Sequence, residues 1–219
     1  MTVDRTVVFL DLSRFTSLTD VHGDIAAVEV VDAFIEAVQG SLPAGARLVK
    51  TLGDGVLVDA AGPASAVALA DAVAHVLHER GGMPELTGGI AAGPVVDRDG
   101  DIFGATVNLA ARLASLAPAG ELRVTRGAAL AAAQAGWQVE PLGEELVRGF
   151  HHPIEVYRVL LCHAADCVVD PVCGMRITPG PSTPTAADTA GGIVWFCGAT
   201  CADRFAAAPD RYQSPELAR

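Results

Sequence analysis

The sequence predicts an α+β fold for most of its 219 residues, followed by a small cysteine-rich module. Short β-favouring apolar runs are interleaved with two long segments whose apolar residues recur at helical spacing. A Gly-Asp-Gly turn joins two of these runs, which is typical of a β-hairpin. All five cysteines lie beyond residue 160, at positions 162, 167, 173, 197 and 201. These observations indicate one medium-sized domain with a short second module behind it.

Charge and hydropathy exclude several classes of partner. The formal net charge of −11 argues against a nucleic acid or an anionic membrane as the main partner. A polyanionic substrate would therefore have to be bound by metal ions or by a few well-placed cations. No apolar run reaches the roughly 18 residues of a membrane span, and no secretory signal is visible. We expect a soluble, cytoplasmic protein.

The N-terminal part predicts a buried strand, a helix and a hairpin. The strand at 6–10 ends in Asp11, where open sheets place ligands, although an acid there can also cap the following helix. The helix at 24–39 has Asp24 as its candidate cap. The hairpin at 46–60 carries Lys50, the single lysine of the chain, four residues before an acid in its glycine turn. A polar hairpin tip is the alternative explanation.

The middle of the chain predicts a second long helix at 63–80, which begins at a proline and ends at a glycine pair. Its two histidines, His75 and His78, are expected to be exposed or half-buried. A strand at 87–96 and a turn at 97–100 follow, and then a helix from residue 104. The remaining expected elements are a strand at 121–125, a helix at 127–135, and a strand pair at 137–142 and 154–160.

Asn108 and Arg112 are four residues apart on the helix from 104 and therefore share one face. Asparagine is mildly unfavourable inside a helix, so its presence calls for a reason. A surface Asn–Arg pair is the alternative to a functional role, and it would be worth only a few tenths of a kcal/mol.

Four motifs in order carry a family resemblance. They are Phe9-Leu-Asp-Leu-Ser-Arg-Phe-Thr16, Lys50-Thr-Leu-Gly-Asp-Gly55, Gly89-Ile-Ala-Ala-Gly93, and Asp101-Ile-Phe-Gly-Ala-Thr-Val-Asn-Leu-Ala-Ala-Arg-Leu113. Over about residues 5–160 the chain resembles the catalytic domain of class III adenylate and guanylate cyclases. The resemblance implies a ferredoxin-like core that works as a head-to-tail homodimer with two sites at its interface.

The resemblance also implies a role for each matching residue. Asp11 and Asp54, helped by the backbone carbonyl of Leu12, would bind two Mg²⁺ or Mn²⁺ ions per site. Lys50 and Asp101 would bind the base. Asn108 and Arg112 would hold the ribose and the triphosphate in the transition state. Two departures stand out: Arg14 replaces a glycine common in the family, and the span from Asp54 to Asp101 is short.

The chemistry of these residue types supports the same function. Attack of a ribose 3′-oxygen on the α-phosphorus needs positioning and charge neutralisation, which carboxylate-bound cations and a forked guanidinium supply. Lys50 as donor and Asp101 as acceptor complement N1 and the 6-amino group of adenine, whereas guanine presents the reverse pattern. We therefore expect an adenylate cyclase that converts ATP to 3′,5′-cyclic AMP and pyrophosphate.

The cysteine-rich end carries two further motifs, Asp170-Pro-Val-Cys-Gly-Met175 and Trp195-Phe-Cys-Gly-Ala-Thr-Cys201. They resemble a YHS domain, a small treble-clef-like module, at about 168–213. This places a connector at 161–167 and a tail at 214–219. The thiolates of Cys173, Cys197 and Cys201 suit Zn²⁺ or another soft or borderline ion.

The fourth ligand of such a site is left open, with Cys162, His163 and Cys167 as candidates. Three reduced cysteines without a metal are the alternative. Because the two modules are fused in one chain, we expect that metal binding by the second module could modulate the cyclase. Two other interpretations remain: a catalytically silent cyclase fold that dimerises or senses a nucleotide or metal, and a metal chaperone whose cyclase-like part mainly dimerises. A full set of metal acids favours the enzyme.

Overall fold

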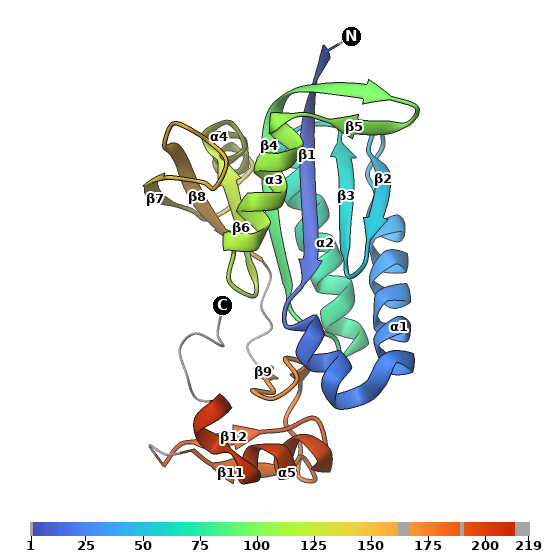
Figure 1. The fold of residues 1–219 in the computed structure, drawn as a ribbon, viewed down its shortest axis with the longest axis vertical. Helices are drawn as coiled ribbons and strands as arrows, with labels where there is room; N and C mark the ends of the chain where they lie inside the picture. Colours follow the sequence, from blue (N-terminus) through green and yellow to red (C-terminus); the bar gives the residue numbers. More distant parts are fainter. Residues whose placement is uncertain (1, 162–166, 189–190, 213–219) are drawn as a thin grey trace.

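The computed structural model describes residues 2–161, 167–188 and 191–212 (Figure 1). The larger part is built around one mixed sheet. Its strands are β1 (Thr2–Leu12), β2 (Arg47–Leu52), β3 (Gly55–Ala60), β4 (Leu86–Arg98), β5 (Asp101–Phe103), β6 (Glu121–Thr125), β7 (Val139–Glu145) and β8 (Ile154–Leu160). Its helices are α1 (Phe15–Ser41), α2 (Pro63–Arg80), α3 (Ala105–Leu116) and α4 (Arg126–Gln134).

The sheet order is β2-β3-β1-β4-β6-β8-β7, and β5 pairs with the end of β4. The first six elements, β1-α1-β2-β3-α2-β4, form the βαββαβ unit of a ferredoxin-like fold, with its strands in the order β2-β3-β1-β4. Only the β4–β6 pair among the ladders of this sheet is parallel. The α+β class predicted from the sequence is therefore confirmed.

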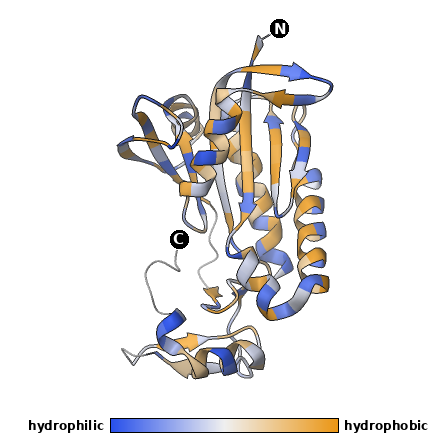
Figure 2. Cartoon of the chain, in the orientation of Figure 1, coloured by the Kyte–Doolittle hydropathy of each residue, from blue (hydrophilic) through white to orange (hydrophobic). Residues whose placement is uncertain are grey.

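Helices cover the sheet on both faces. Alternate residues of β1 point to opposite sides, so Val8 and Leu10 pack against α1 and α2 while Val7 packs towards α3. All six residues of β3 are buried. Figure 2 shows the hydrophobic positions concentrated along the central strands and the helices that cover them. Among the described residues, no helix combines the length and apolar character needed to cross a membrane.

The C-terminal segment forms a small body at the lower end of the view, beside the start of α1 (Figure 1). It consists of β9 (Val168–Val169), β10 (Arg176–Ile177), β11 (Thr185–Ala187), β12 (Ile193–Trp195), α5 (Ala199–Ala207) and a 3₁₀ turn at Pro209–Tyr212. Its core is a separate cluster around Phe196 and Phe205, to which Val21 of α1 contributes. Most of the predicted connector and the whole predicted tail lie outside the described residues.

β1 is longer than predicted, at Thr2–Leu12 instead of 6–10, and α1 and β5 depart from the prediction for reasons that lie in the structure. α1 begins at Phe15 rather than at residue 24, because a short helical segment precedes Gly23. Gly23 itself has φ 84° and ψ 168°, so the helix is broken there. The predicted helix began at the next residue, Asp24. β5 was not predicted, because three residues are too few to show a strand period and their only ladder is with the end of β4.

The glycines of β4 set the position of α3. A Cβ added at Gly89 would lie 2.0 Å from the carbonyl oxygen of Ala110 and 2.4 Å from the backbone nitrogen of Ala114. The helix therefore lies directly on the strand. Its first turn is fixed by the buried Thr106, whose hydroxyl donates to the carbonyl of Pro94 at 2.8 Å. This close packing fixes which way Asn108 and Arg112 point.

Replacing Gly89 with alanine should lower the free energy of unfolding by about 1–3 kcal/mol, because the added methyl group would overlap the α3 backbone. Urea unfolding followed by circular dichroism measures this. Gly127→Ala on α4 is the matched control, because no atom lies within 4 Å of the place that its Cβ would take. It should leave stability unchanged or raise it by about 0.5–1 kcal/mol. Equal stability of the two variants would contradict the close packing of α3.

Candidate active site

Two predicted metal ligands meet at the end of β1. Asp11 pairs with Gly55 across the β1–β3 ladder, and the Leu12 N–H donates to the carbonyl of Asp54 at 3.3 Å. Burial, and secondly the negative charge of Asp54, raise the pKa of Asp11 to about 6. The tight β2–β3 turn therefore brings both acids to one place.

This pair of acids fits a divalent cation. A Cβ at position 55 would lie 2.9 Å from Asp11 Oδ1, so the glycine leaves space beside the carboxylate. Two adjacent carboxylates are the hard oxygen ligands that Mg²⁺ and Mn²⁺ prefer, and a bound cation would relieve their mutual repulsion. A third ligand from the Leu12 carbonyl stays a prediction.

The two predicted base-binding residues contact each other. Lys50 Nζ donates to Asp101 Oδ2 at 2.7 Å, and the Ile102 N–H donates to the other carboxylate oxygen at 2.8 Å. The hydrogen bond from Lys50 is the main cause that lowers the pKa of Asp101. The ammonium group also lies 5.4 Å from the ring centroid of Phe103. A donor and an acceptor thus lie side by side, and about one-third of each side chain is exposed to solvent.

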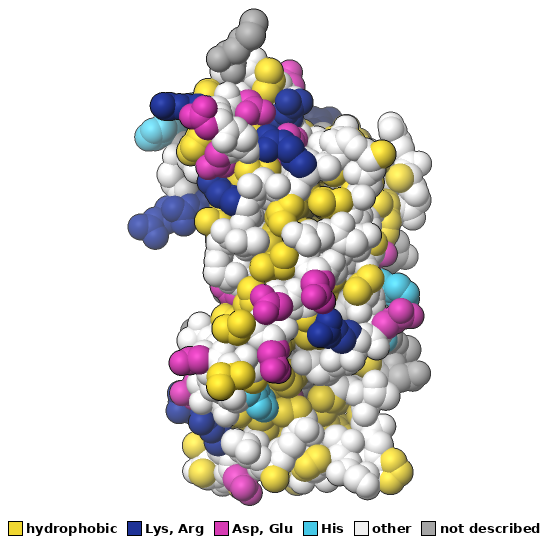
Figure 3. Space-filling model, turned by 90° about the vertical axis from the view of Figure 1, so that its right-hand side faces the viewer, with side chains coloured by type: hydrophobic (Ala, Val, Ile, Leu, Met, Phe, Trp, Pro, Cys, Tyr) yellow, Lys and Arg dark blue, Asp and Glu magenta, His cyan; other side chains and the backbone are white. Residues whose placement is uncertain are grey.

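An ion-pair network holds β5 over β2. Arg47 donates to the carbonyl of Gly100 at 2.6 Å and forms ion pairs of 3.3 Å with Asp97 and with the buried Asp59. Arg5 adds a 3.2 Å ion pair to Asp59. Basic side chains intermix with acidic ones at the upper end of the face in Figure 3. The network positions Asp101 through the turn that precedes it.

Asn108 and Arg112 line a separate cavity of about 750 Å³ between α3 and the β7–β8 loop. The loop contributes Arg148, His151 and His152 to the same cavity. This concentration of cationic and polar groups stands out in a chain of net charge −11. Arg148 was not predicted as a site residue, although its place beside two histidines in one loop was a usable signal.

The structure thus groups the six predicted side chains as three pairs. Asp11 lies with Asp54, Lys50 with Asp101, and Asn108 shares a cavity with Arg112. The acids lie at the end of β1, whereas β5 pairs with the part of β4 beyond the opposite end of β1, at the top of Figure 1. Asp101 therefore comes from the opposite end of β1, whereas Lys50 pairs with Leu57, which pairs in turn with Phe9, two residues from Asp11.

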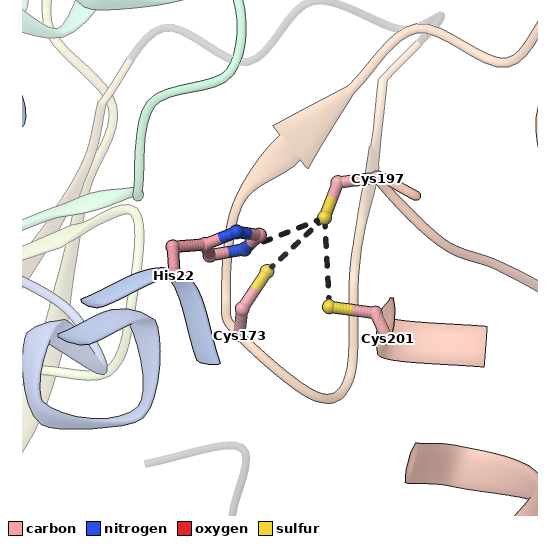
Figure 4. A group of neighbouring side chains, drawn as sticks. All are labelled: His22, Cys173, Cys197 and Cys201. Atoms are coloured by element: carbon pink, nitrogen blue, oxygen red, sulfur yellow. Dashed lines mark hydrogen bonds between the residues drawn. The ribbon is translucent and has the colours of Figure 1, made fainter. Parts of the chain in front are cut away.

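The predicted cysteine ligands also converge. Cys197 Sγ lies 3.6 Å from Cys173 Sγ and 3.5 Å from Cys201 Sγ. Hydrogen bonds from the two neighbouring thiols lower the pKa of Cys173 to about 5. A fourth group, His22 Nε2, lies 3.6 Å from Cys197 Sγ (Figure 4). Sequence reasoning missed this histidine, because it precedes Cys197 by 175 residues and lies on a helical segment that was not predicted.

Cys167 does not take the place of fourth ligand that the sequence left open for it. Its sulfur lies 3.5 Å from His78 Nδ1 and 3.5 Å from the Thr178 hydroxyl. The reason is the short β9 strand, which starts at the next residue and pairs with β10. The other two candidates, Cys162 and His163, lie outside the described residues. His75 and His78 are exposed and half-buried, as expected.

Comparison with known proteins agrees with this geometry. Residues 2–160 match the adenylate and guanylate cyclase catalytic domain family. An adenylate cyclase from Streptomyces coelicolor is 50% identical over 122 residues, which cover 53% of this chain and 31% of that protein. The chain thus spans about a third of the length of this curated relative.

Solved structures give the same fold. The adenylyl cyclase CyaB from P. aeruginosa superposes with a TM-score of 0.61 at 23% identity, over 74% of this chain and 97% of that one. An adenylate/guanylate cyclase/hydrolase from Silicibacter pomeroyi superposes with a TM-score of 0.59 at 26% identity, over 75% of this chain and 99% of that one.

Fold and site together define a nucleotidyl cyclase catalytic domain. The chain belongs to the adenylate and guanylate cyclase catalytic domain family, which confirms the resemblance over residues 2–160. The assignment of the C-terminal segment to the YHS family, and the domain boundaries at 160 and 168, stay predictions.

Proposed function

We propose that this protein is an adenylate cyclase that converts ATP to 3′,5′-cyclic AMP and pyrophosphate. The observation that carries the proposal is the Lys50–Asp101 pair at 2.7 Å within a cyclase domain. Its ammonium can donate to adenine N1 and its carboxylate can accept from the 6-amino group. Guanine would place a donor against the ammonium and an acceptor against the carboxylate. The similarity to the Streptomyces coelicolor adenylate cyclase supports the same substrate.

Asp11 and Asp54 are the residues that would hold two Mg²⁺ or Mn²⁺ ions. When bound, such ions lower the pKa of an attacking hydroxyl and neutralise phosphate charge. The other side chains act directly on the nucleotide. Asn108 orients the ribose, and Arg112 offers a permanently charged, forked donor to the phosphate oxygens as charge develops. Arg148, in the same cavity, adds a second positive charge.

A symmetric head-to-tail homodimer completes the proposal. As the resemblance to class III cyclases implies, one active site would take its metals from one subunit and its base-binding pair from the other; β5, which carries Asp101, lies beyond the opposite end of β1 from Asp11. Exposed apolar side chains on β4 and β5 support an interface there: Val96 is 40% and Phe103 48% exposed. Each dimer would hold two complete sites.

The test uses the purified protein with ATP or GTP and with Mn²⁺ or Mg²⁺, and it quantifies cyclic nucleotides by mass spectrometry. Cyclic AMP should form from ATP, and cyclic GMP from GTP should be slower by at least about tenfold, the equivalent of one unmatched polar contact. Comparable rates would contradict the role of the Lys50–Asp101 pair. No product from a folded dimer would favour the catalytically silent sensing protein.

A further inference from the structure

Four metal-ligating side chains from separate parts of the chain point at one another (Figure 4). His22 comes from α1, Cys173 from the turn after β9, Cys197 from the loop after β12, and Cys201 from α5. Their ligand atoms all lie within 4.8 Å of one another. Cys173 and Cys201 are fully buried.

We propose that His22, Cys173, Cys197 and Cys201 form one tetrahedral Zn²⁺ site that joins the C-terminal segment to the cyclase domain. A tetrahedron with Zn–S bonds of ~2.3 Å has sulfur–sulfur edges of ~3.8 Å. The two measured sulfur–sulfur distances are 3.6 and 3.5 Å, and the measured sulfur–nitrogen distance is 3.6 Å. Three thiolates and one imidazole nitrogen form a ligand set that structural zinc sites use.

A disulfide explains the cluster less well. A disulfide bond has a sulfur–sulfur distance of about 2.05 Å and would use two of the three sulfurs. A disulfide would not explain why the third thiol and His22 lie beside the two bonded sulfurs. All three sulfurs belong to free cysteines.

The surroundings of the cluster fix the two loops that carry its ligands. The fully buried Asp170 accepts the N–H of Val172 through Oδ1 at 2.8 Å and the N–H of Cys197 through Oδ2 at 2.8 Å. One carboxylate therefore ties the Cys173 turn to the Cys197 loop. Such outer partners orient the ligands of metal sites. A segment of this size has little core of its own, so a metal would supply much of its folding energy.

The position of His22 links this site to the catalytic end of β1. The helical segment from Phe15 to His22 lies between the loop after Asp11 and the break at Gly23. The C-terminal segment contacts both ends of it: Arg14 donates to the carbonyl of Pro171, and Arg204 pairs with Asp20. A zinc ion held by His22 would fix this segment from its far end. Zinc occupancy should therefore influence the loop after Asp11. Any resulting effect on catalysis rests on the proposed function.

The experiment measures zinc directly in the whole chain, purified under reducing conditions with zinc supplied. We expect one zinc per chain, and X-ray absorption should show three sulfur ligands at ~2.3 Å and one imidazole nitrogen at ~2.0–2.1 Å. In His22→Ala the imidazole ligand should vanish. Competition with a chelator should show that His22→Ala binds zinc more weakly than the wild type. The loss should exceed the roughly 10–100-fold that is typical when a residue hydrogen-bonded to a metal ligand is removed. His75→Ala is the matched control, because it removes an exposed imidazole from α2.

Hydrogen exchange provides a readout that does not depend on cyclase activity. Removing zinc from the wild type should speed exchange of the amides in 15–22, while chelator should change those amides little in His22→Ala. Absence of zinc from the reconstituted wild type would overturn the proposal, and so would unchanged zinc affinity in His22→Ala. Zinc binding as described without cyclic AMP synthesis would instead refute the proposed function and leave the metal site standing.

Discussion

Asp54→Asn should abolish cyclic AMP synthesis. The substitution keeps the shape of the side chain but removes one of the two negative charges that would hold the divalent ions at the end of β1. Loss of one preorganised electrostatic group typically costs roughly 10²–10³ in rate, and loss of a metal ligand should cost at least as much. Initial rates at saturating Mn²⁺ measure it. Asp32→Asn, a position on α1 away from the acid pair, is the control and should retain full activity.

The same variant should become more stable without metal. In the wild type, burial and the charge of Asp54 raise the pKa of Asp11 to about 6 from its ordinary value of 3.8. A raised carboxyl pKa means that the folded state loses stability as the pH rises from about 4 through 6, because the carboxyl group then ionises where it is buried and, secondly, next to another charge. Removing Asp54 relieves part of this cost.

Melting temperatures in a chelator show the effect. Asp54→Asn should melt higher than the wild type at pH 7.5, and the difference should shrink at pH 5, where Asp11 is largely protonated. A lower melting temperature at pH 7.5 would mean that Asp54 supports the fold rather than metal binding, and the loss of activity would then need another explanation.

Arg112→Ala should lower the turnover number by roughly 10²–10³, because under the proposed function this cavity-lining arginine is the forked donor that would face the developing phosphate charge. The Michaelis constant for ATP should change less, because the charge that Arg112 would stabilise develops only in the transition state. Steady-state kinetics separate the two effects. Arg126→Ala, which removes an exposed arginine from α4, should behave as the wild type.

Mixing this variant with Asp54→Asn tests the shared active site. Each variant alone should be inactive. If the metal acids and Arg112 of one site come from different subunits, random mixing gives half heterodimers, each with one intact site. The mixture should then recover about one quarter of the wild-type activity. An inactive mixture of freely exchanging dimers would contradict the head-to-tail arrangement.

Local signals in the sequence were enough to predict most of the fold. α2 runs from Pro63 to Arg80 as expected, because a proline and a glycine pair mark its two ends. The strand end at Asp11 and the hairpin turn at Asp54 are short-range features, but only the family resemblance predicted that the two acids act together.

What the sequence did not reveal depends on contacts between distant segments. The first segment of α1 has little apolar periodicity, and Val21 packs instead into the core of the C-terminal body. His22 could be recognised as a ligand candidate only after that packing was known. Likewise, Arg148 joins Asn108 and Arg112 only because the β7–β8 loop folds against α3.

The Lys50–Asp101 ion pair has a consequence for how the proposed enzyme would choose its nucleotide. In the free protein each group already has a partner, yet an ammonium has three donors and a carboxylate has several acceptor positions, so under the proposed function adenine could bind without breaking the pair. Adenine would add two hydrogen bonds to the one that the pair already makes. Guanine would leave the ammonium facing a donor and the carboxylate facing an acceptor. Discrimination would then come from rejection of the wrong base more than from attraction of the right one.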